Sequence, residues 1–194
     1  MKAYTIIGGV NGTGKSSFTG VFSVERNDLG VIVDTNKIVK EHGGDRLKGG
    51  KAALSLIGRC IADDVDFTQE TTLSGIRTLK NILLAREKGY SIRLYYIGIS
   101  SAEESIKRIA NRVAKGGHST PSEDVRRRFA KRYEDILRIL PYCNEAYFYD
   151  NENGFVLSAA YRNGQIRPIG NEKAPEWIDE LISYIMTKRN DRHG

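Results

Sequence analysis

A glycine-rich segment near the start of the chain constrains the fold more than any other feature. Residues 9–16 read Gly-Val-Asn-Gly-Thr-Gly-Lys-Ser and match the pattern G-x-x-x-x-G-K-[ST] at every fixed position. A short, apolar, β-branched run at residues 4–7 comes directly before it. A strand, then this loop, then a helix is the arrangement that binds the phosphates of a nucleoside triphosphate. The pattern therefore predicts an α/β fold whose first strand is buried.

Each residue of this loop has a predicted role in holding a triphosphate. The glycines let backbone N–H groups converge on one point at the start of a helix. Lys15 is expected to contact the β- and γ-phosphates, the Ser16 hydroxyl to bind Mg²⁺, and Ser17 to approach the α-phosphate. The loop therefore predicts binding of ATP or GTP, and ATP with Mg²⁺ is the expected cofactor pair. The predicted ATP-binding residues of the loop are Gly9, Val10, Asn11, Gly12, Thr13, Gly14, Lys15, Ser16 and Ser17.

Strand and helix signals alternate along the chain. Apolar runs predict strands at residues 4–7, 31–34, 65–67, 91–99 and 146–149. Helical spacing and capping patterns predict helices at 51–62, 76–88, 101–115 and 120–140, and a last helix from Pro175. Asn163-Gly164 predicts a hairpin between runs at 155–162 and 165–169. This order indicates one domain over residues 1–194, with three layers and a mostly parallel central sheet.

Carboxylates follow three of the predicted strands. Asp34 ends the second strand, Glu70 follows the third, and Asp150 follows the strand at 146–149. Ligands of open α/β sheets bind at the carboxyl ends of the strands, so we expect these groups to meet the glycine-rich loop. Three roles suit Asp34. It could hold a metal-bound water with Ser16, accept the proton of an attacking hydroxyl, or cap the next helix, a role that Asn36 suits equally.

Basic residues concentrate between residues 107 and 132. This window holds nine lysines and arginines and two acidic residues, so it carries a net charge of +7 in a chain whose total is +6. Arg108 can pair with Glu104 one helical turn earlier, whereas Arg112 has no acidic neighbour at that spacing. Arg112 is therefore either solvated or placed to meet a phosphate.

A second basic helix is predicted after the first. Its apolar face places Arg127 outward, as a partner of Glu123, and Arg128 at the edge of that face. Arg128 either pairs with Asp124 or faces the site. Two cationic helices joined by a glycine pair predict a lid at about residues 101–140 that closes over the triphosphate and excludes water.

Composition and charge exclude several classes of function. No apolar run approaches the roughly 18 residues of a membrane span. Cys60 and Cys143 are the two cysteines and lack metal-binding spacing, which is typical of reduced thiols in a cytoplasmic protein. The positive charge is local, which favours a small anionic ligand over nucleic acid, since nucleic-acid binding requires a broader basic surface.

Several sequence blocks, taken in order, resemble the zeta-toxin family of P-loop kinases. The blocks extend from about residue 4 to 151 and are the loop at 8–17, Glu-Thr-Thr-Leu-Ser-Gly at 70–75, Arg108-x-x-x-Arg112-Val, Gly-Gly-His at 116–118, Arg-Arg-Phe at 127–129 and Tyr-Asp-Asn at 149–151. The blocks at 71–75 and 116–118 are distinctive, whereas the phosphate loop is common to many families. The resemblance implies the P-loop kinase fold with an arginine-rich helical lid and a C-terminal hairpin plus helix. It also makes a protein antitoxin a candidate partner.

The resemblance implies a kinase that phosphorylates a sugar nucleotide. In the toxin members this substrate is UDP-N-acetylglucosamine, which is phosphorylated on the 3′-hydroxyl of the sugar. The resemblance assigns residues by position: substrate contacts to Glu70, Thr71 and Thr72, phosphate contacts to Arg112 and Arg128, a place near the ATP base to Asp150 and Asn151, and a place in the lid to His118. Arg108 is also expected to bind ATP, and Asp34 and His118 to bind the substrate. His118 is equally suited to a hinge without a chemical role.

Asn36 departs from the family pattern. Members often carry Asp-x-Asp or Asn-x-Asp after the second strand, and the second carboxylate is taken as the base. Here Asp34-Thr35-Asn36 places an amide at that position, and an amide cannot accept a proton. Either Asp34 takes the role, or the activity is weak or different. The predicted catalytic residues are Lys15, Asp34, Asn36, Arg112 and Arg128, and the predicted metal ligands are Ser16 and Asp34.

Three functional hypotheses remain open on the sequence alone. The leading hypothesis is an ATP-dependent kinase for a sugar nucleotide or another small molecule. A second hypothesis keeps the kinase and gives it a nucleoside, a coenzyme or a polynucleotide 5′ end as acceptor. The third is a regulatory module that binds ATP with a weakened catalytic site, and Asn36 is the residue that raises it.

Overall fold

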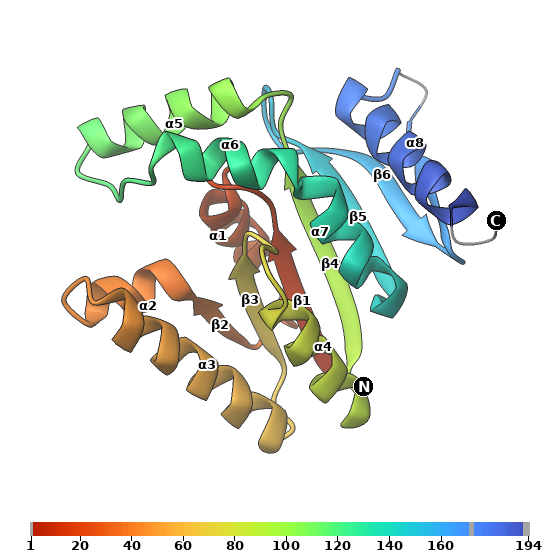
Figure 1. Cartoon of the computed structure of the whole chain (residues 1–194). Helices are drawn as coiled ribbons and strands as arrows, with labels where there is room; N and C mark the ends of the chain where they lie inside the picture. Colours follow the sequence, from red (N-terminus) through yellow and green to blue (C-terminus); the bar gives the residue numbers. More distant parts are fainter. Residues whose placement is uncertain (1, 171–172, 192–194) are drawn as a thin grey trace.

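The computed structural model describes residues 2–170 and 173–191 of the chain. A seven-stranded sheet runs through it in the order β2-β3-β1-β4-β5-β6-β7 (Figure 1). The strands β1 to β5 are parallel, and β6 and β7 are antiparallel. Their bounds are β1 Ala3–Gly8, β2 Val31–Asp34, β3 Phe67–Thr71, β4 Ser91–Gly98, β5 Glu145–Asp150, β6 Val156–Arg162 and β7 Gln165–Pro168.

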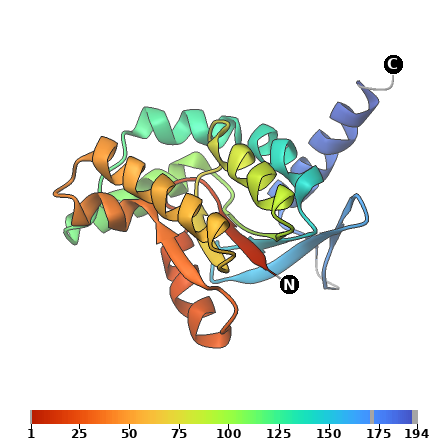
Figure 2. The same cartoon turned by 90° about the horizontal axis from the view of Figure 1, so that it is seen from below.

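Helices connect the strands and cover both faces of the sheet. Figure 2 shows α1 on one face and α3, α4 and α7 on the other. Figure 1 shows α5 and α6 running across the ends toward which β1, β3 and β4 point. The bounds are α1 Lys15–Glu25, α2 Thr35–Glu41, α3 Arg46–Ala62, α4 Arg77–Glu87, α5 Ala102–Ala114, α6 Ser122–Ala130, α7 Arg132–Ile139, a 3-10 turn at Leu140–Tyr142, and α8 Glu176–Asn190.

Alternate residues of the central strand β1 enter two separate cores. Tyr4 and Ile6 join the larger core, which also takes side chains from α3, α4, α7 and α8. Ile7 points to the opposite face and packs with Phe18 and Phe22 of α1. A strand buried on both faces reads as a continuous apolar run, which is why the sequence at 4–7 indicated a strand. No helix within the described ranges is long and apolar enough to cross a membrane.

The predicted fold class is confirmed, with differences in individual elements: α2 was not predicted, and α3 begins at Arg46 where the prediction began at residue 51. The sheet is mostly parallel, helices lie on both faces, and β6, β7 and α8 form the C-terminal hairpin and helix. The third strand begins at Phe67 and extends to Thr71, later than the predicted 65–67. The helix predicted over 120–140 breaks at Lys131 into α6 and α7. The guanidinium of Arg132 explains the break, because it donates to the Phe129 carbonyl oxygen at the end of α6.

Candidate active site

The phosphate loop lies between β1 and α1, as predicted. Gly9, Gly12 and Gly14 have φ angles of 146°, 85° and 92°, which side chains rarely allow. A Cβ at Gly12 would also lie 2.6 Å from the carbonyl oxygen of Ser105 on α5. The loop therefore needs glycine both for its backbone conformation and for its close approach to α5.

Hydrogen bonds hold the loop in shape. The Val10 carbonyl oxygen accepts from Thr13 Oγ1 at 3.0 Å and from Lys15 Nζ at 2.9 Å. From outside the loop, Asn151 Nδ2 donates to the Thr13 carbonyl oxygen at 2.8 Å. Helix α1 begins at Lys15, so its free N–H groups lie at the loop, where an anion is favoured.

A cavity of about 440 Å³ lies beside the loop. Loop and early α1 residues line it together with Thr35 and Asn36 at the start of α2 and residues 69–72 at the end of β3 and beyond. The two helices predicted to form a lid contribute Arg108, Ile109 and Arg112 from α5 and Arg128 from α6. The structure thus brings most of the predicted site residues into one cavity.

Glu70 lies against the serine predicted to bind Mg²⁺. Its Oε2 accepts a hydrogen bond from Ser16 Oγ at 2.7 Å, and the residue is 7% exposed. Among the described residues, Glu70 is the one carboxylate that lines the cavity. Burial raises the pKa of Glu70, and the negative charge of Asp34 acts in the same direction.

The oxygen donors of this pair fit Mg²⁺. At nucleotide sites Mg²⁺ takes one or two protein oxygens and completes its shell with phosphate and water. Ser16 and Glu70 supply such oxygens beside the phosphate loop. Within residues 2–170 and 173–191 no three His, Cys, Asp or Glu residues come together as a metal cage. A dedicated cage is not what Mg²⁺ requires, so Ser16 and Glu70 are the residues that would hold it.

Asp34 caps α2, one of the three roles that the sequence allowed. Its Oδ1 accepts from the backbone N–H groups of Asn36 at 2.8 Å and Lys37 at 3.3 Å. The carboxylate hydrogen-bonded to Ser16 is that of Glu70, and the predicted metal pair of Ser16 and Asp34 stays a prediction. Of the block Asp34-Thr35-Asn36, Thr35 and Asn36 line the cavity, and neither side chain is a carboxylate that could accept a proton.

Lys15 lies among the charges of the site. Burial lowers its pKa to about 8, and the positive charge of Arg112 adds to the lowering. The negative charge of Glu70 opposes it. An anion that binds beside Nζ favours the protonated form of Lys15 and therefore raises its pKa again.

Arg112 and Arg128 are the two site arginines without a carboxylate partner. Arg112 Nη2 donates to the His118 carbonyl oxygen at 2.7 Å, and Arg128 Nη1 donates to Asn11 Oδ1 at 2.6 Å. In the part of the chain that the structure describes, no carboxylate oxygen lies within 4.0 Å of either guanidinium group. Both side chains line the cavity, so their charge is available to a phosphate.

The neighbouring ion pairs differ in part from the predictions. Arg127 pairs with Asp124 at 2.6 Å, so the predicted pair of Arg127 with Glu123 is wrong, and so is the alternative pair of Arg128 with Asp124. Asp124 and Arg127 are three residues apart, so their side chains lie on the same face of α6. The predicted pair of Arg108 with Glu104 is confirmed at 2.7 Å.

Arg108 ties the lid to the segment after β5. Its Nη1 donates to the Asn151 carbonyl oxygen at 2.7 Å, and its Nη2 donates to the Glu152 carbonyl oxygen at 3.1 Å. The residue also lines the cavity. Arg108 thus combines a structural contact with a position beside the phosphate loop.

Two residues assigned by resemblance lie differently from expectation. The His118 side chain is exposed and does not line the cavity; its carbonyl oxygen is what contacts Arg112. The Asp150 carboxylate does not line the cavity either, and it accepts from Trp177 Nε1 at 2.8 Å. Thr71 and Thr72 do line the cavity, as the resemblance implied.

Sequence reasoning missed three residues of the cavity wall. These are Thr35, Gln69 and Ile109. Gln69 lies next to Glu70 at the carboxyl end of β3, and Tyr4 donates to its side-chain oxygen. Its position near the end of a strand could have indicated that Gln69 faces the site. Because the predicted strand ended at residue 67, that position was not recognised.

Comparisons with known proteins agree with this fold. No family model matches the chain. An uncharacterized protein of Haemophilus influenzae is 29% identical over 126 residues, which is 62% of this chain and 88% of that protein. A chain from the PezAT chromosomal toxin-antitoxin system of Streptococcus pneumoniae superposes with a TM-score of 0.61 at 15% identity, over 98% of this chain and 87% of that chain.

A second structure gives the same result. A chain of the AvrRxo1-ORF1:-ORF2 complex with ATP superposes with a TM-score of 0.68 at 16% identity. The match covers 95% of this chain and 63% of that chain, so this protein spans less than two thirds of its length. These likenesses show the fold alone: the chain shares its α/β fold with a chain of a toxin-antitoxin system and with a chain of the AvrRxo1-ORF1:-ORF2 complex.

Proposed function

We propose that the chain is an ATP-dependent phosphotransferase that passes the γ-phosphoryl group to a hydroxyl. The observation that carries this proposal is one cavity lined by a phosphate loop, a Ser16–Glu70 pair and two arginines without carboxylate partners. Enzymes accelerate phosphoryl transfer mainly by positioning the reactants and stabilising negative charge. In the cavity, the phosphate loop and the Ser16–Glu70 pair would position the reactants, and the two arginines would stabilise negative charge.

Each group has a role in this reaction. The loop N–H groups and Lys15 hold the β- and γ-phosphates at the start of α1. Mg²⁺, when bound, neutralises charge on these phosphates, and Ser16 and Glu70 would hold it. Arg112 and Arg128 face the cavity and stabilise the charge that builds on the transferred group.

The amide at Asn36 is compatible with this chemistry. In a loose transition state the attacking hydroxyl forms little bond to phosphorus, so charge stabilisation contributes more than a strong base. Asn36 can accept a hydrogen bond from the hydroxyl and orient it. In such a reaction the hydroxyl loses its proton late, and an oxygen of the transferred phosphoryl group can accept it, which leaves Glu70 to hold Mg²⁺.

A sugar nucleotide such as UDP-N-acetylglucosamine is the acceptor that we propose. Support comes from the family resemblance of residues 70–75 and from the polar side chains Asn36, Gln69 and Thr72 in the cavity wall. Amides and hydroxyls suit the hydroxyl groups of a sugar. The fold likeness to a toxin-antitoxin chain supports, as part of the same proposal, a protein antitoxin as partner.

Transfer of phosphate from labelled ATP tests the proposal. The chain is incubated with Mg²⁺, ATP and a panel of UDP-sugars, nucleosides, coenzymes and oligonucleotides with a free 5′-hydroxyl. The expected result is transfer to a UDP-sugar that Lys15→Ala abolishes. Slow hydrolysis alone, unchanged in Lys15→Ala, would overturn the proposal, and transfer to another acceptor would overturn its sugar-nucleotide part.

One observation favours a second candidate function. Asn36 occupies the cavity position where the family often has a carboxylate, as expected for a regulatory module that binds ATP without transferring phosphate. Tight ATP binding without transfer to any acceptor would support this module, provided that Asn36→Asp does not restore transfer. Transfer restored by Asn36→Asp would instead identify a weakened kinase.

A further inference from the structure

Trp177, the single tryptophan of the chain, lies at the start of α8 with its indole over the end of β4. The residue is 3% exposed, and a Cβ at Gly98 would lie 2.5 Å from the indole ring. Because Gly98 has no side chain, the indole can pack directly against the backbone of β4. The backbone N–H of Asn151 donates to the Gly98 carbonyl oxygen at 3.0 Å, so the indole lies where the β5–β6 segment begins.

Asp150 uses both carboxylate oxygens to hold this segment. Oδ1 accepts from Trp177 Nε1 at 2.8 Å, and Oδ2 accepts from the backbone N–H of Glu152 at 3.1 Å. Both donors are N–H groups, so a carboxylate satisfies them and an amide would present its NH₂ to one of them. The turn at residues 150–152 is thereby fixed to α8.

Asn151, at the centre of this turn, connects the phosphate loop to the lid. Its Nδ2 donates to the Thr13 carbonyl oxygen at 2.8 Å, and its carbonyl oxygen accepts from Arg108 at 2.7 Å. Asn151 also approaches the loop closely, because a Cβ at Gly14 would lie 2.5 Å from its Nδ2. A small shift of the turn therefore moves the group that braces the loop.

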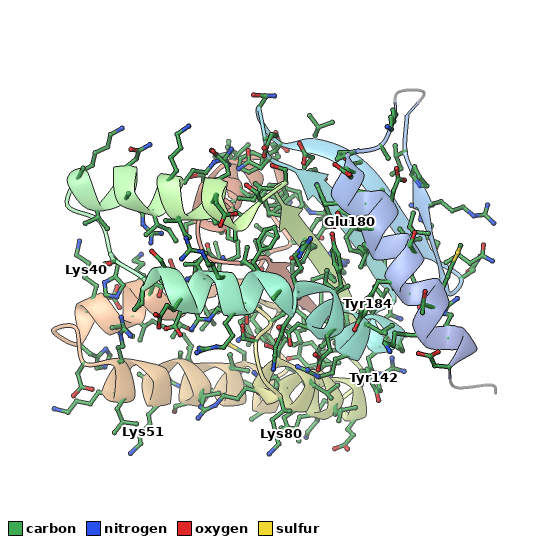
Figure 3. The ribbon with its side chains drawn as sticks, turned by 45° about the horizontal axis from the view of Figure 1, so that its top comes forward. Lys40, Lys51, Lys80, Tyr142, Glu180 and Tyr184 are labelled. Carbon is green, nitrogen blue, oxygen red and sulfur yellow. The ribbon has the colours of Figure 1, made fainter. Side chains whose placement is uncertain are left out.

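Helix α8 is anchored on its other side to α7. The Tyr133 hydroxyl lies 3.0 Å from the Trp177 carbonyl oxygen and 2.7 Å from Glu180 Oε2. Arg132 Nη2 donates to the same Glu180 oxygen at 3.0 Å. Figure 3 labels Glu180 on α8 among the side chains between that helix and the rest of the molecule. These contacts keep the indole of Trp177 in place against Asp150.

We infer that Asp150 and Trp177 are positioning residues for the ATP site, acting through Asn151. The inference rests on the proposed function, and it gives Asp150 an indirect role where the family resemblance implied a place near the ATP base. The Trp177–Asp150 bond fixes the turn, the turn fixes Asn151, and Asn151 fixes the Thr13 carbonyl and Arg108. Neither Asp150 nor Trp177 lines the cavity.

The test compares Asp150→Asn, Trp177→Phe and the double variant with the unmodified chain. Calorimetry with Mg²⁺ and ATP should show binding about five- to tenfold weaker in each single variant, the size of one lost hydrogen bond. The double variant should bind no more weakly than the singles, since both remove the same interaction. Amide hydrogen exchange should become faster in peptides that cover residues 9–17.

A control separates this role from general destabilisation. Tyr90→Phe removes hydroxyl bonds to the carbonyl oxygens of Cys60 and Val65, which lie outside the cavity. It should lower the free energy of unfolding while leaving ATP affinity and exchange at 9–17 unchanged. Equal effects of Tyr90→Phe and Trp177→Phe on ATP affinity would overturn the inference.

The remaining outcomes are also decisive. Weaker ATP binding in Asp150→Asn with normal binding in Trp177→Phe would mean that Asp150 acts without Trp177, through Glu152 or by contact with the nucleotide, and would overturn the inference. If Trp177→Phe does not fold, Asp150→Asn alone decides. A folded Asp150→Asn variant with unchanged ATP affinity and unchanged amide exchange at residues 9–17 also overturns the inference. ATP binding requires no acceptor, so an unmodified chain that binds ATP without transferring phosphate contradicts the proposed kinase alone. An unmodified chain that binds no ATP contradicts both.

Discussion

The protonation of Lys15 should make ATP binding depend on pH. Burial lowers the pKa of this lysine to about 8 from its usual 10.5. A bound triphosphate places negative charge beside Nζ and favours the charged form, so the pKa rises again in the complex. The free protein therefore loses the Lys15 proton as the pH rises through 8, and ATP must then restore it. The affinity should fall with rising pH.

The magnitude follows from the pKa of the free protein. At pH 7 about a tenth of the free chains carry a neutral Lys15, and at pH 9 about nine tenths do. If the bound form stays protonated over this range, the affinity drops about tenfold between pH 7 and pH 9. Binding should take up about 0.1 proton per ATP at pH 7 and about 0.9 at pH 9.

Calorimetry in two buffers with different ionisation enthalpies measures both quantities. Proton uptake appears as a difference in the binding enthalpy between the buffers, and the affinity comes from the same titrations. Lys15→Arg is the matched control, because an arginine keeps its charge at pH 9 and its proton uptake should be near zero. Equal affinity at pH 7 and pH 9, with no proton uptake at pH 9, would refute the reasoning.

Three further predictions concern single residues. Glu70→Gln should raise the Mg²⁺ concentration needed for half-maximal transfer by about 10- to 100-fold, and an unchanged Mg²⁺ titration would count against the Ser16–Glu70 site. Arg128→Ala should lower kcat about a thousandfold with a smaller change in KM, whereas Arg127→Ala, which breaks a surface pair, should match the unmodified chain in the same assay. Leu73→Ala should lower the free energy of unfolding in urea by about 2–5 kcal/mol, because the side chain is 1% exposed in the core; a loss below about 1 kcal/mol would contradict that packing.

Local signals predicted the parts of the fold that local geometry determines. The phosphate loop and the hairpin turn both need positive φ angles, and Asn163-Gly164 has them at 51° and 79°. Glycine and asparagine adopt positive φ angles more readily than other residues, so their presence in the sequence indicates such turns. The extent of β3 was missed because Gln69 and Glu70 are polar residues inside a strand, placed there by the cavity that they face.

Long-range contacts explain what the sequence did not show. The break between α6 and α7 is stabilised by Arg132, which bonds Glu180 on α8, 48 residues away. The choice of Glu70 over Asp34 beside Ser16 follows from strand order. Strand β3 lies next to β1, with Glu70 in register with Ile7, whereas β2 lies one strand further out. Nothing in the chain order of these strands reveals which one neighbours β1.

Three of the four cationic side chains that line the cavity share a property that bears on how readily a nucleotide is exchanged. Lys15, Arg112 and Arg128 each donate to a neutral oxygen, a backbone carbonyl for the first two and the Asn11 amide for the third. A neutral acceptor, unlike a carboxylate, offers no opposite charge that would compete with a phosphate for these groups. An incoming triphosphate therefore displaces weak competitors from groups that are already ordered, and the departing nucleotide leaves the same ordered state behind.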